Sequence, residues 1–256
     1  MMNTNAPKRY ILLVMSATFL QGSAFVASKT LLHDVQPIWL ASMRFSVAAV
    51  SLAPFLAPRL LRHQADYRHL MPWPQLVVIG LLQTAGVMAF LNIGLASTTA
   101  GKASILMATN PLLVAVLSGR VLNDKVSLYS WLGMSIAFVG VVICIGGGEI
   151  VAGTVGRGEL LVMAAACCWA LSTVLATKFN LHIDAWVVSF WQMLIGSIAL
   201  ALLAVVRDDP FSIPVSSTTW IAFIWLAIPA STGAMGLWFA ALRLGGAVRT
   251  SGFLFL

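Results

Sequence analysis

The sequence predicts an all-α, polytopic membrane protein, and three observations support this prediction. Of the 256 residues, 60% are hydrophobic and 9% are charged, whereas soluble domains carry about 25% charged residues. The mean hydropathy is correspondingly high, at +0.94. The apolar residues form long runs between short polar turns. A backbone inside hydrocarbon satisfies its hydrogen bonds only within helices or closed barrels.

Nine apolar runs are the expected membrane-spanning helices. At about 1.5 Å per residue, a run of roughly 20 residues crosses a hydrocarbon layer of about 30 Å. In chain order the runs cover residues 10–32, 37–57, 75–96, 100–121, 127–146, 159–177, 184–206 and 218–242, with a ninth from 247 to 256. Lys8 and Arg9 before the first run also fit a signal peptide, but the many runs that follow favour a transmembrane helix.

The basic residues between the runs predict the orientation. With a cytoplasmic N-terminus, ten Lys and Arg residues lie inside and four outside, while Arg44 lies within a run. The positive-inside rule therefore favours a cytoplasmic N-terminus. This distribution explains the net charge of +7 without nucleic acid as a partner. The inside residues are Lys8, Arg9, Arg59, Arg62, Arg68, Arg120, Lys125, Lys178, Arg243 and Arg249, and the outside ones are Lys29, Lys102, Arg157 and Arg207.

A weak internal repeat divides the chain into residues 1–148 and 149–256. Several residues recur at a nearly constant offset, in the same order along both halves. The pairs are Trp39 and Trp186, Lys102 and Arg249, and Ser104 and Ser251 at 147 positions, with Lys29 and Lys178 at 149. Each unit would hold five helices, an odd number, so the second unit would be inverted in the membrane. Many secondary transporters are built from such inverted repeats.

The stretch 100–141, AGKASILMATNPLLVAVLSGRVLNDKVSLYSWLGMSIAFVGV, resembles the end of a repeat in the drug/metabolite transporter superfamily, EamA type. The shared features are a small-residue start, a mid-helix Asn-Pro, a charged turn, and the later Trp-Leu-Gly and Val-Gly-Val. The family usually has Glu-Arg where Asp124-Lys125 stands here. The resemblance implies two five-helix repeats and the export of amino acids or related solutes.

The second repeat is expected to be incomplete. At the offset of 147, Asn110-Pro111 would correspond to positions 257 and 258, beyond Leu256. The sequence therefore predicts eight or nine of ten helices and a chain truncated at its C-terminus. A non-transporting remnant or a membrane interaction subunit is the alternative function.

The sequence offers few residues inside the spans that could support enzyme catalysis. All eight acidic residues and all four His fall in loops or at helix ends, and the His residues match no zinc spacing. The three Cys lie in apolar runs without a CxxC motif. We expect no catalytic residue, no metal and no cofactor. The lack of a mid-membrane carboxylate also argues against a small-multidrug-type proton exchanger.

Two features of the spans are candidates for solute binding. Arg44 lies about seven residues, or roughly 10 Å, into the second span. It could bind a carboxylate or phosphate, or it could snorkel to the interface or cap a neighbouring helix. Pro111 removes one helical hydrogen bond, and Asn110 could cap a half-helix that begins there. Such a helix end attracts anionic groups, although a simple packing kink fits the motif equally.

Four further polar or aromatic side chains complete the candidate set. Gln83 and Gln192 are uncharged polar residues inside spans, where they would contact solute or bond a neighbouring helix. Trp169 and Trp238 lie well inside spans, where they would line an aromatic cavity or pack. The resemblance places Trp169 where the family often has Trp-Gly, a place that Gln21-Gly22 takes in the first repeat.

These observations predict a secondary transporter in a bacterial-type inner membrane. Its solutes would be small zwitterionic or anionic metabolites, and it would work by alternating access between the two repeats. The expected partners are the solute and the lipid bilayer, with a homodimer left open.

Overall fold

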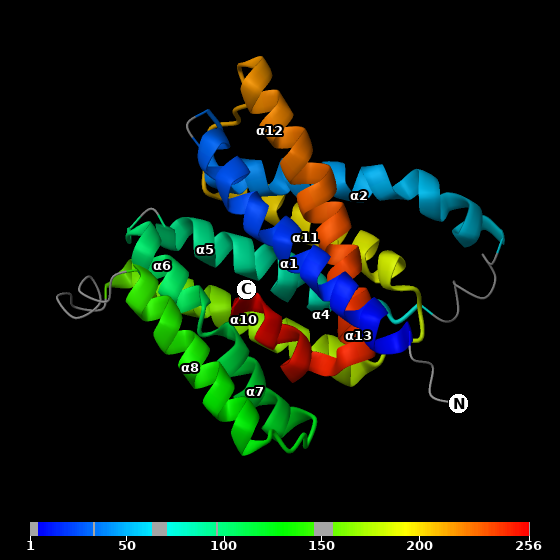
Figure 1. Ribbon diagram of the computed structural model, residues 1–256. Helices are drawn as coiled ribbons and strands as arrows, with labels where there is room; N and C mark the ends of the chain where they lie inside the picture. Colours follow the sequence, from blue (N-terminus) through cyan, green and yellow to red (C-terminus); the bar gives the residue numbers. More distant parts are fainter. Residues whose placement is uncertain (1–4, 33, 63–70, 96, 146–155, 256) are drawn as a thin grey trace.

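The described part of the chain consists of helices and turns, which confirms the all-α class. The computed structural model describes residues 5–32, 34–62, 71–95, 97–145 and 156–255, and no strand occurs among them (Figure 1). The elements are α1 (Asn5–Leu31), α2 (Pro37–Arg62), α4 (Trp73–Ile79), η1 (Gly80–Gly86), α5 (Val87–Leu95), α6 (Ala100–Met107), α7 (Asn110–Val121), α8 (Leu128–Ile145), α10 (Arg157–Phe179), α11 (Ala185–Val206), α12 (Ser217–Ala227), η2 (Ile228–Gly233), α13 (Ala234–Gly252) and η3 (Phe253–Phe255).

Several of these helical segments are long and apolar enough to cross a membrane, as the sequence predicts. Within the described residues there are six: Pro37–Leu56, Trp73–Leu95, Gly101–Val121, Arg157–Phe179, Ala185–Val206 and Ser217–Gly252. Leu128–Gly140 is a shorter apolar helix. The multi-span character is therefore confirmed, and the count of eight or nine spans stays a prediction.

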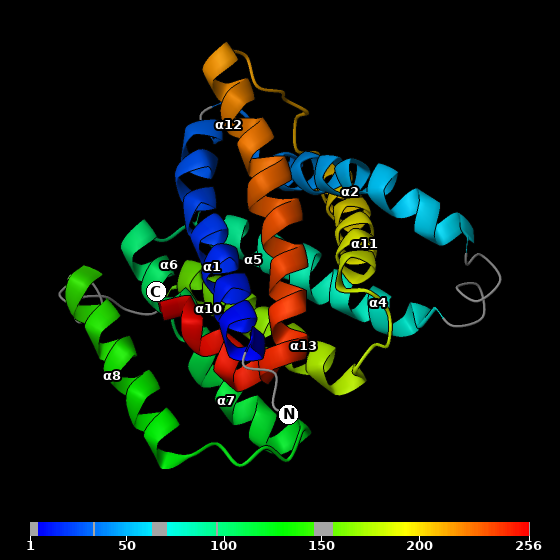
Figure 2. The ribbon, with the colours of Figure 1, turned by 45° about the vertical axis from the view of Figure 1, so that its right-hand side comes forward.

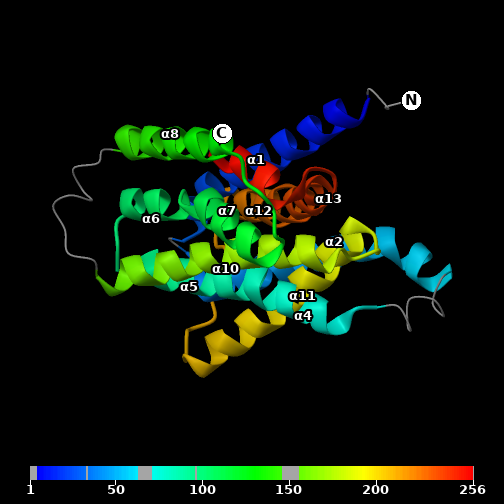
Figure 3. The same cartoon turned by 90° about the horizontal axis from the view of Figure 1, so that it is seen from below.

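The helices pack in pairs that join the two halves of the sequence. α1 lies beside the continuous segment α12–η2–α13 (Figures 1 and 2), and α10 lies beside α5 (Figure 3). α2 packs along α11, and the largest apolar cluster lies around this contact, with Phe45, Met193 and Trp238 among its buried members. α8 stands at the edge of the bundle in Figure 2.

Two spans contain π-helical segments that the sequence analysis did not predict. η1 interrupts the third predicted span between α4 and α5, and η2 interrupts the eighth between α12 and α13. Pro229 in η2 lacks a backbone N–H, which favours a local departure from the α-helical ladder. The two segments begin at Gly80 and Ile228, 148 positions apart. Single π turns inside α-helices often occur at functional sites.

The sequence predicts a gap at residues 243–246, between the eighth and ninth spans, and the structure has a kink there. α13 continues through it to Gly252, and the chain turns at Gly246, where φ is +71°. Only glycine adopts this backbone conformation without strain. Several predicted positions lie outside the described residues: the span ends at 96, 146 and 256, the boundary between 148 and 149, and the loop 63–70.

Candidate functional site

Arg44 lies inside the bundle and links α2 to η2. Its side chain is 8% exposed, and its Nε donates a hydrogen bond to Ser231 Oγ at 2.6 Å. The guanidinium carbon lies 4.8 Å from the centre of the Phe45 ring. Thr232, beside Ser231, donates to the backbone oxygen of Ala48 at 2.9 Å. The Arg44 side chain therefore points into the protein and does not snorkel to the membrane interface.

Gln192 makes a corresponding link between α11 and η1. It is fully buried, and its Oε1 accepts a hydrogen bond from Thr84 Oγ1. The two segments meet at close range, because a Cβ added to Gly196 would lie 2.3 Å from Thr84 Cβ. Any side chain larger than hydrogen at Gly196 would therefore push α11 away from η1.

The two links occupy related positions in the sequence. Arg44 and Gln192 are 148 positions apart, and Thr84 and Ser231 are 147 apart. In each link a residue of α2 or α11 bonds a hydroxyl in the π segment of the opposite half of the chain. Sequence analysis missed both hydroxyls. Applying the offset of 147 to Thr84 would have identified its counterpart.

Trp169 and Trp238 come together, as an aromatic cavity or a packed pair would require. Their ring centroids are 6.3 Å apart with an interplanar angle of 62°. Trp238 is fully buried. The two rings come from α10 and α13, which pack against each other. Gln83, in η1, is 3% exposed, so it too is a core side chain.

Besides Asn110, four of the candidate side chains carry buried polar atoms that lack a hydrogen-bond partner in the described structure. They come from η1, α10, α11 and α13, and each of these segments packs against at least two of the others. Leaving a buried polar group unpaired costs about 1–3 kcal/mol, and a polar ligand that paired with these atoms would remove that cost. The atoms are Gln83 Oε1, Gln192 Nε2, Trp169 Nε1 and Trp238 Nε1. Ser172 and Thr173 have unpaired buried hydroxyls on α10 and were not predicted.

The break at Asn110-Pro111 is confirmed, but the predicted cap is wrong. α6 ends at Met107 and α7 begins at Asn110, with Pro111 in its first turn. The residue at the cap position is Thr109, which makes no capping hydrogen bond through its side chain. Asn110 is already helical, and its Nδ2 donates to the backbone oxygen of Ala166 in α10 at 3.2 Å. The buried amide therefore links two helices, although its Oδ1 remains unpaired.

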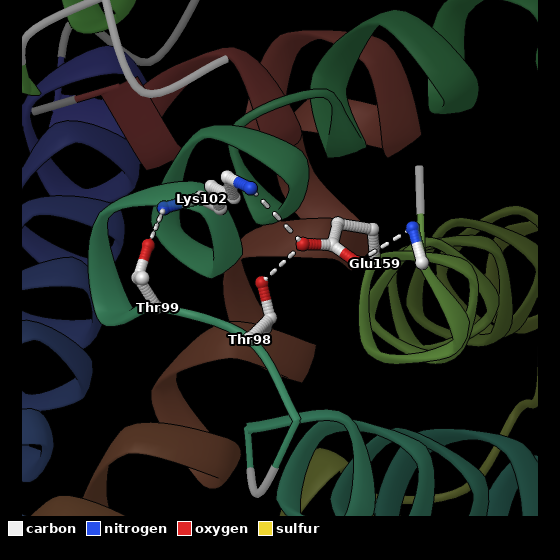
Figure 4. A network of polar contacts seen from close by, with 5 residues as sticks. Thr98, Thr99, Lys102 and Glu159 are labelled. Carbon is white, nitrogen blue, oxygen red and sulfur yellow. Dashed lines mark hydrogen bonds and ion pairs between the residues drawn. The ribbon is translucent and has the colours of Figure 1, made fainter. Parts of the chain in front are cut away.

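Glu159 joins the first turns of α6 and α10 (Figure 4). Its Oε1 accepts a hydrogen bond from Thr98 Oγ1 at 2.7 Å and lies 3.5 Å from Lys102 Nζ. Its Oε2 accepts from the backbone N–H of Gly156 at 3.0 Å. A carboxylate at this position also interacts favourably with the positive end of α10. Together these contacts hold the start of α6 against the start of α10.

Arg249 makes the related contact after the kink in α13. Its guanidinium carbon lies 4.5 Å from the centre of the Tyr10 ring, and the Tyr10 hydroxyl is 3.3 Å from Thr250 Oγ1. Lys102 and Arg249 are 147 positions apart, while Tyr10 and Glu159 are 149 apart. Among the described residues, no three His, Cys, Asp or Glu side chains gather as metal ligands would.

Apolar spans packed around buried polar and aromatic side chains define a multi-pass membrane protein. The chain belongs to the EamA-like transporter family, whose model matches residues 8–146 and 156–256. It is therefore a member of a membrane transporter family.

The chain is similar to two proteins of Bacillus subtilis that are named as uncharacterized transporters and to a plant protein that is named as WAT1-related. The uncharacterized transporter YoaV of Bacillus subtilis is 26% identical over 83% of this chain and 70% of its own length. The uncharacterized transporter YyaM of the same organism is 27% identical over 95% of this chain and 80% of its own. A chloroplastic WAT1-related protein of Arabidopsis thaliana is 25% identical over 95% of this chain and 60% of its own.

The fold is shared with a solved crystal structure. It superposes with a TM-score of 0.77 over 96% of this chain and 83% of that chain, at 21% identity. At this level of identity the likeness concerns the fold alone.

Proposed function

We propose that the protein is a secondary transporter of the plasma membrane that exports small zwitterionic or anionic metabolites such as amino acids. The observation that carries this proposal is the set of buried, unpaired N–H donors on Trp169, Trp238 and Gln192. Arg44 adds a buried positive charge on the neighbouring α2. Among the described residues, the acidic ones lie in turns, in loops or in the first turn of a helix, so the spans offer donors and positive charge to a carboxylate.

The transport cycle would use two inverted repeats, residues 1–148 and 149–256. The related links support this proposal: Arg44 bonds Ser231 in one, and Gln192 bonds Thr84 in the other. The π segments begin 148 positions apart, close to the offset of these pairs. The two stretches matched by the family model, 8–146 and 156–256, also fall on either side of the proposed boundary.

The related end contacts supply two gates for alternating access. In an inverted arrangement, the Lys102–Glu159 pair and the Arg249–Tyr10 pair would lie toward opposite membrane faces. Each contact is of modest strength, of order 1 kcal/mol. Contacts of this strength can open and close in turn without unfolding the bundle. The proposed N-terminus is cytoplasmic, which places Lys102 outside and Arg249 inside.

A flux assay in proteoliposomes tests the proposal. Purified protein would be reconstituted, loaded with a mixture of unlabelled amino acids and assayed for uptake of labelled amino acids by exchange. We expect uptake above protein-free liposomes, and we expect Arg44→Gln to reduce it at least tenfold. Arg207→Gln is the matched control, because Arg207 is exposed at the end of α11.

The controls separate a binding role from a folding defect. Each variant must elute as a single species and keep a thermal midpoint close to that of the parent chain. Normal folding with unchanged exchange in Arg44→Gln would refute the role of Arg44. No exchange by the parent chain, for any amino acid or small organic acid, would favour a structural or interaction role instead.

A further inference from the structure

Gln21, in α1, carries a buried side-chain amide without a hydrogen-bond partner. Its Oε1 and its Nε2 are both buried, and neither is bonded within the described part of the chain. Gln21 lies about 11 residues into the first predicted span, which is near the middle of a hydrocarbon layer of about 30 Å. A neutral amide at this depth usually bonds a neighbouring helix, and the Gln21 amide does not.

The amide belongs to the buried face of α1. Steps of three and four residues place side chains on one face of a helix, and such steps join Gln21 to Val14, Ala17 and Ala24. These three residues are 0%, 0% and 7% exposed. The Gln21 amide therefore lies inside the bundle rather than against lipid.

Two neighbours on this face fix the level of Gln21 in the bundle. Ala17, one turn before it, belongs to the apolar cluster that contains Trp238. Ala24, nearly one turn after it, belongs to the cluster that contains Ala230 in η2. Gln21 therefore lies between the level of Trp238 and that of η2.

The packing of α1 on η2 agrees with this placement. A Cβ added to Gly233, the last residue of η2, would lie 3.4 Å from Leu20 Cδ1. α1 packs against both η2 and α13 (Figure 2). Because Arg44 donates to Ser231 in η2, Gln21 lies in the same region as the buried positive charge of the proposed solute site.

The repeat relates Gln21 to Trp169. The two residues are 148 positions apart, which is also the offset between Arg44 and Gln192. Trp169 Nε1 is likewise buried and unpaired. In an inverted arrangement the two side chains would face the solute from opposite halves of the chain. The Trp169 indole offers a donor only, whereas the Gln21 amide offers both donors and an acceptor.

The unpaired atoms of Gln21 require two kinds of partner. The Nε2 group can donate to a carboxylate, but the Oε1 atom can only accept, from an N–H or O–H group. Gln83 Oε1 is a second buried acceptor without a partner. An organic anion that lacks a donor would leave both oxygens unpaired. A solute with an ammonium group beside its carboxylate can pair with both kinds of atom.

We propose that Gln21 contacts the solute and makes the site selective for α-amino acids over organic anions that lack an amino group. The Nε2 group donates to the carboxylate, and the Oε1 atom accepts from the ammonium group. This inference rests on the proposed transport function, which by itself admits zwitterions and anions alike, and it narrows that function to the zwitterions.

Competition in the proteoliposome exchange assay tests this selectivity in the parent chain. For each labelled amino acid that exchanges, the competitors are the same unlabelled amino acid and its 2-oxo acid, which carries a keto oxygen in place of the amino group. We expect the amino acid to compete at about 10- to 100-fold lower concentration, because the 2-oxo acid leaves the buried acceptors unpaired.

Gln21→Met separates a role in binding from a role in structure. The variant keeps the length of the side chain and removes both polar atoms. We expect the preference over the 2-oxo acid to fall about tenfold. The thermal midpoint should rise by about 2–12 °C, because the bundle no longer buries an unpaired amide. A structural hydrogen bond from Gln21 would give the opposite change in the midpoint.

Gln75→Met is the matched control. Gln75 Oε1 is also buried and unpaired, but Gln75 lies in the first turn of α4, at the end of a span. This variant should leave the preference over the 2-oxo acid unchanged.

The outcomes separate this inference from the proposed function. Equal competition by amino acids and 2-oxo acids in the parent chain would leave transport standing and overturn the selectivity. An unchanged preference or a lower midpoint in Gln21→Met would overturn the role of Gln21, as would an equal loss of preference in Gln75→Met. No exchange of any labelled amino acid would overturn the proposed function and this inference with it.

Discussion

Gly196→Ala tests the close contact between α11 and η1. The added Cβ would lie 2.3 Å from Thr84 Cβ and 2.9 Å from the backbone oxygen of Gly80, whereas real Cβ contacts essentially never fall under 3.0 Å. To relieve this clash, α11 and η1 would have to separate by about 1 Å. That movement would also stretch the hydrogen bond from Thr84 to Gln192.

The expected cost combines two effects. Overpacking a buried contact costs about 1–3 kcal/mol, and loss of one hydrogen bond adds about 0.5–1.5 kcal/mol. A total of about 1.5–4.5 kcal/mol lowers the thermal midpoint of a chain of this size by roughly 3–18 °C. Tryptophan fluorescence during heating in detergent would measure it, since the chain has nine Trp residues.

Gly133→Ala is the matched control for this experiment. Gly133 is exposed in α8, and an added Cβ there meets nothing within 4 Å. Alanine is the better helix former, so this variant should be unchanged or up to about 1 kcal/mol more stable. Equal midpoints for the two variants would refute the close α11–η1 contact.

Two further predictions concern buried polar links. Ser231→Ala removes the hydroxyl that Arg44 donates to, and it should lower stability by about 1.5–3 kcal/mol, the range for a hydrogen bond to a charged group. A thermal midpoint within about 1 °C of the parent would contradict this link. Asn110→Leu removes the bond to the Ala166 oxygen and should cost about 0.5–1.5 kcal/mol. Chemical denaturation in mixed micelles would measure it, and a more stable variant would show that the bond contributes nothing.

The sequence predicts the helical class and most span positions because hydrocarbon leaves the backbone few choices. Apolar runs of sufficient length must become helices, and Pro111 must interrupt one of them. The polar residues at span starts are also informative. Asp184, for example, accepts from the backbone N–H of Trp186 at 2.8 Å at the start of α11.

The sequence does not predict the π segments or the hydrogen-bond partners of the buried side chains. Periodicity arguments assume 3.6 residues per turn, so they do not reveal η1, which contains no proline. Thr84 and Ser231 look like ordinary hydroxyls in apolar spans, and only the tertiary contact distinguishes them. The local sequence, with Asn before Pro, favours Asn110 as the cap of a half-helix. The packing of α7 on α10 instead pairs its amide with the backbone oxygen of Ala166.

Cysteine labelling of two related positions tests the inverted repeat most directly. Ser97 and Leu244 are both exposed and stand 147 positions apart. Ser97→Cys and Leu244→Cys would be made separately in a chain whose three native cysteines are replaced by serine, and each would be treated in cells with a membrane-impermeant maleimide. We expect Ser97→Cys to react in intact cells and Leu244→Cys to react only after permeabilisation. Labelling of both from the same side would contradict the inverted repeat and, with it, the proposed transport cycle.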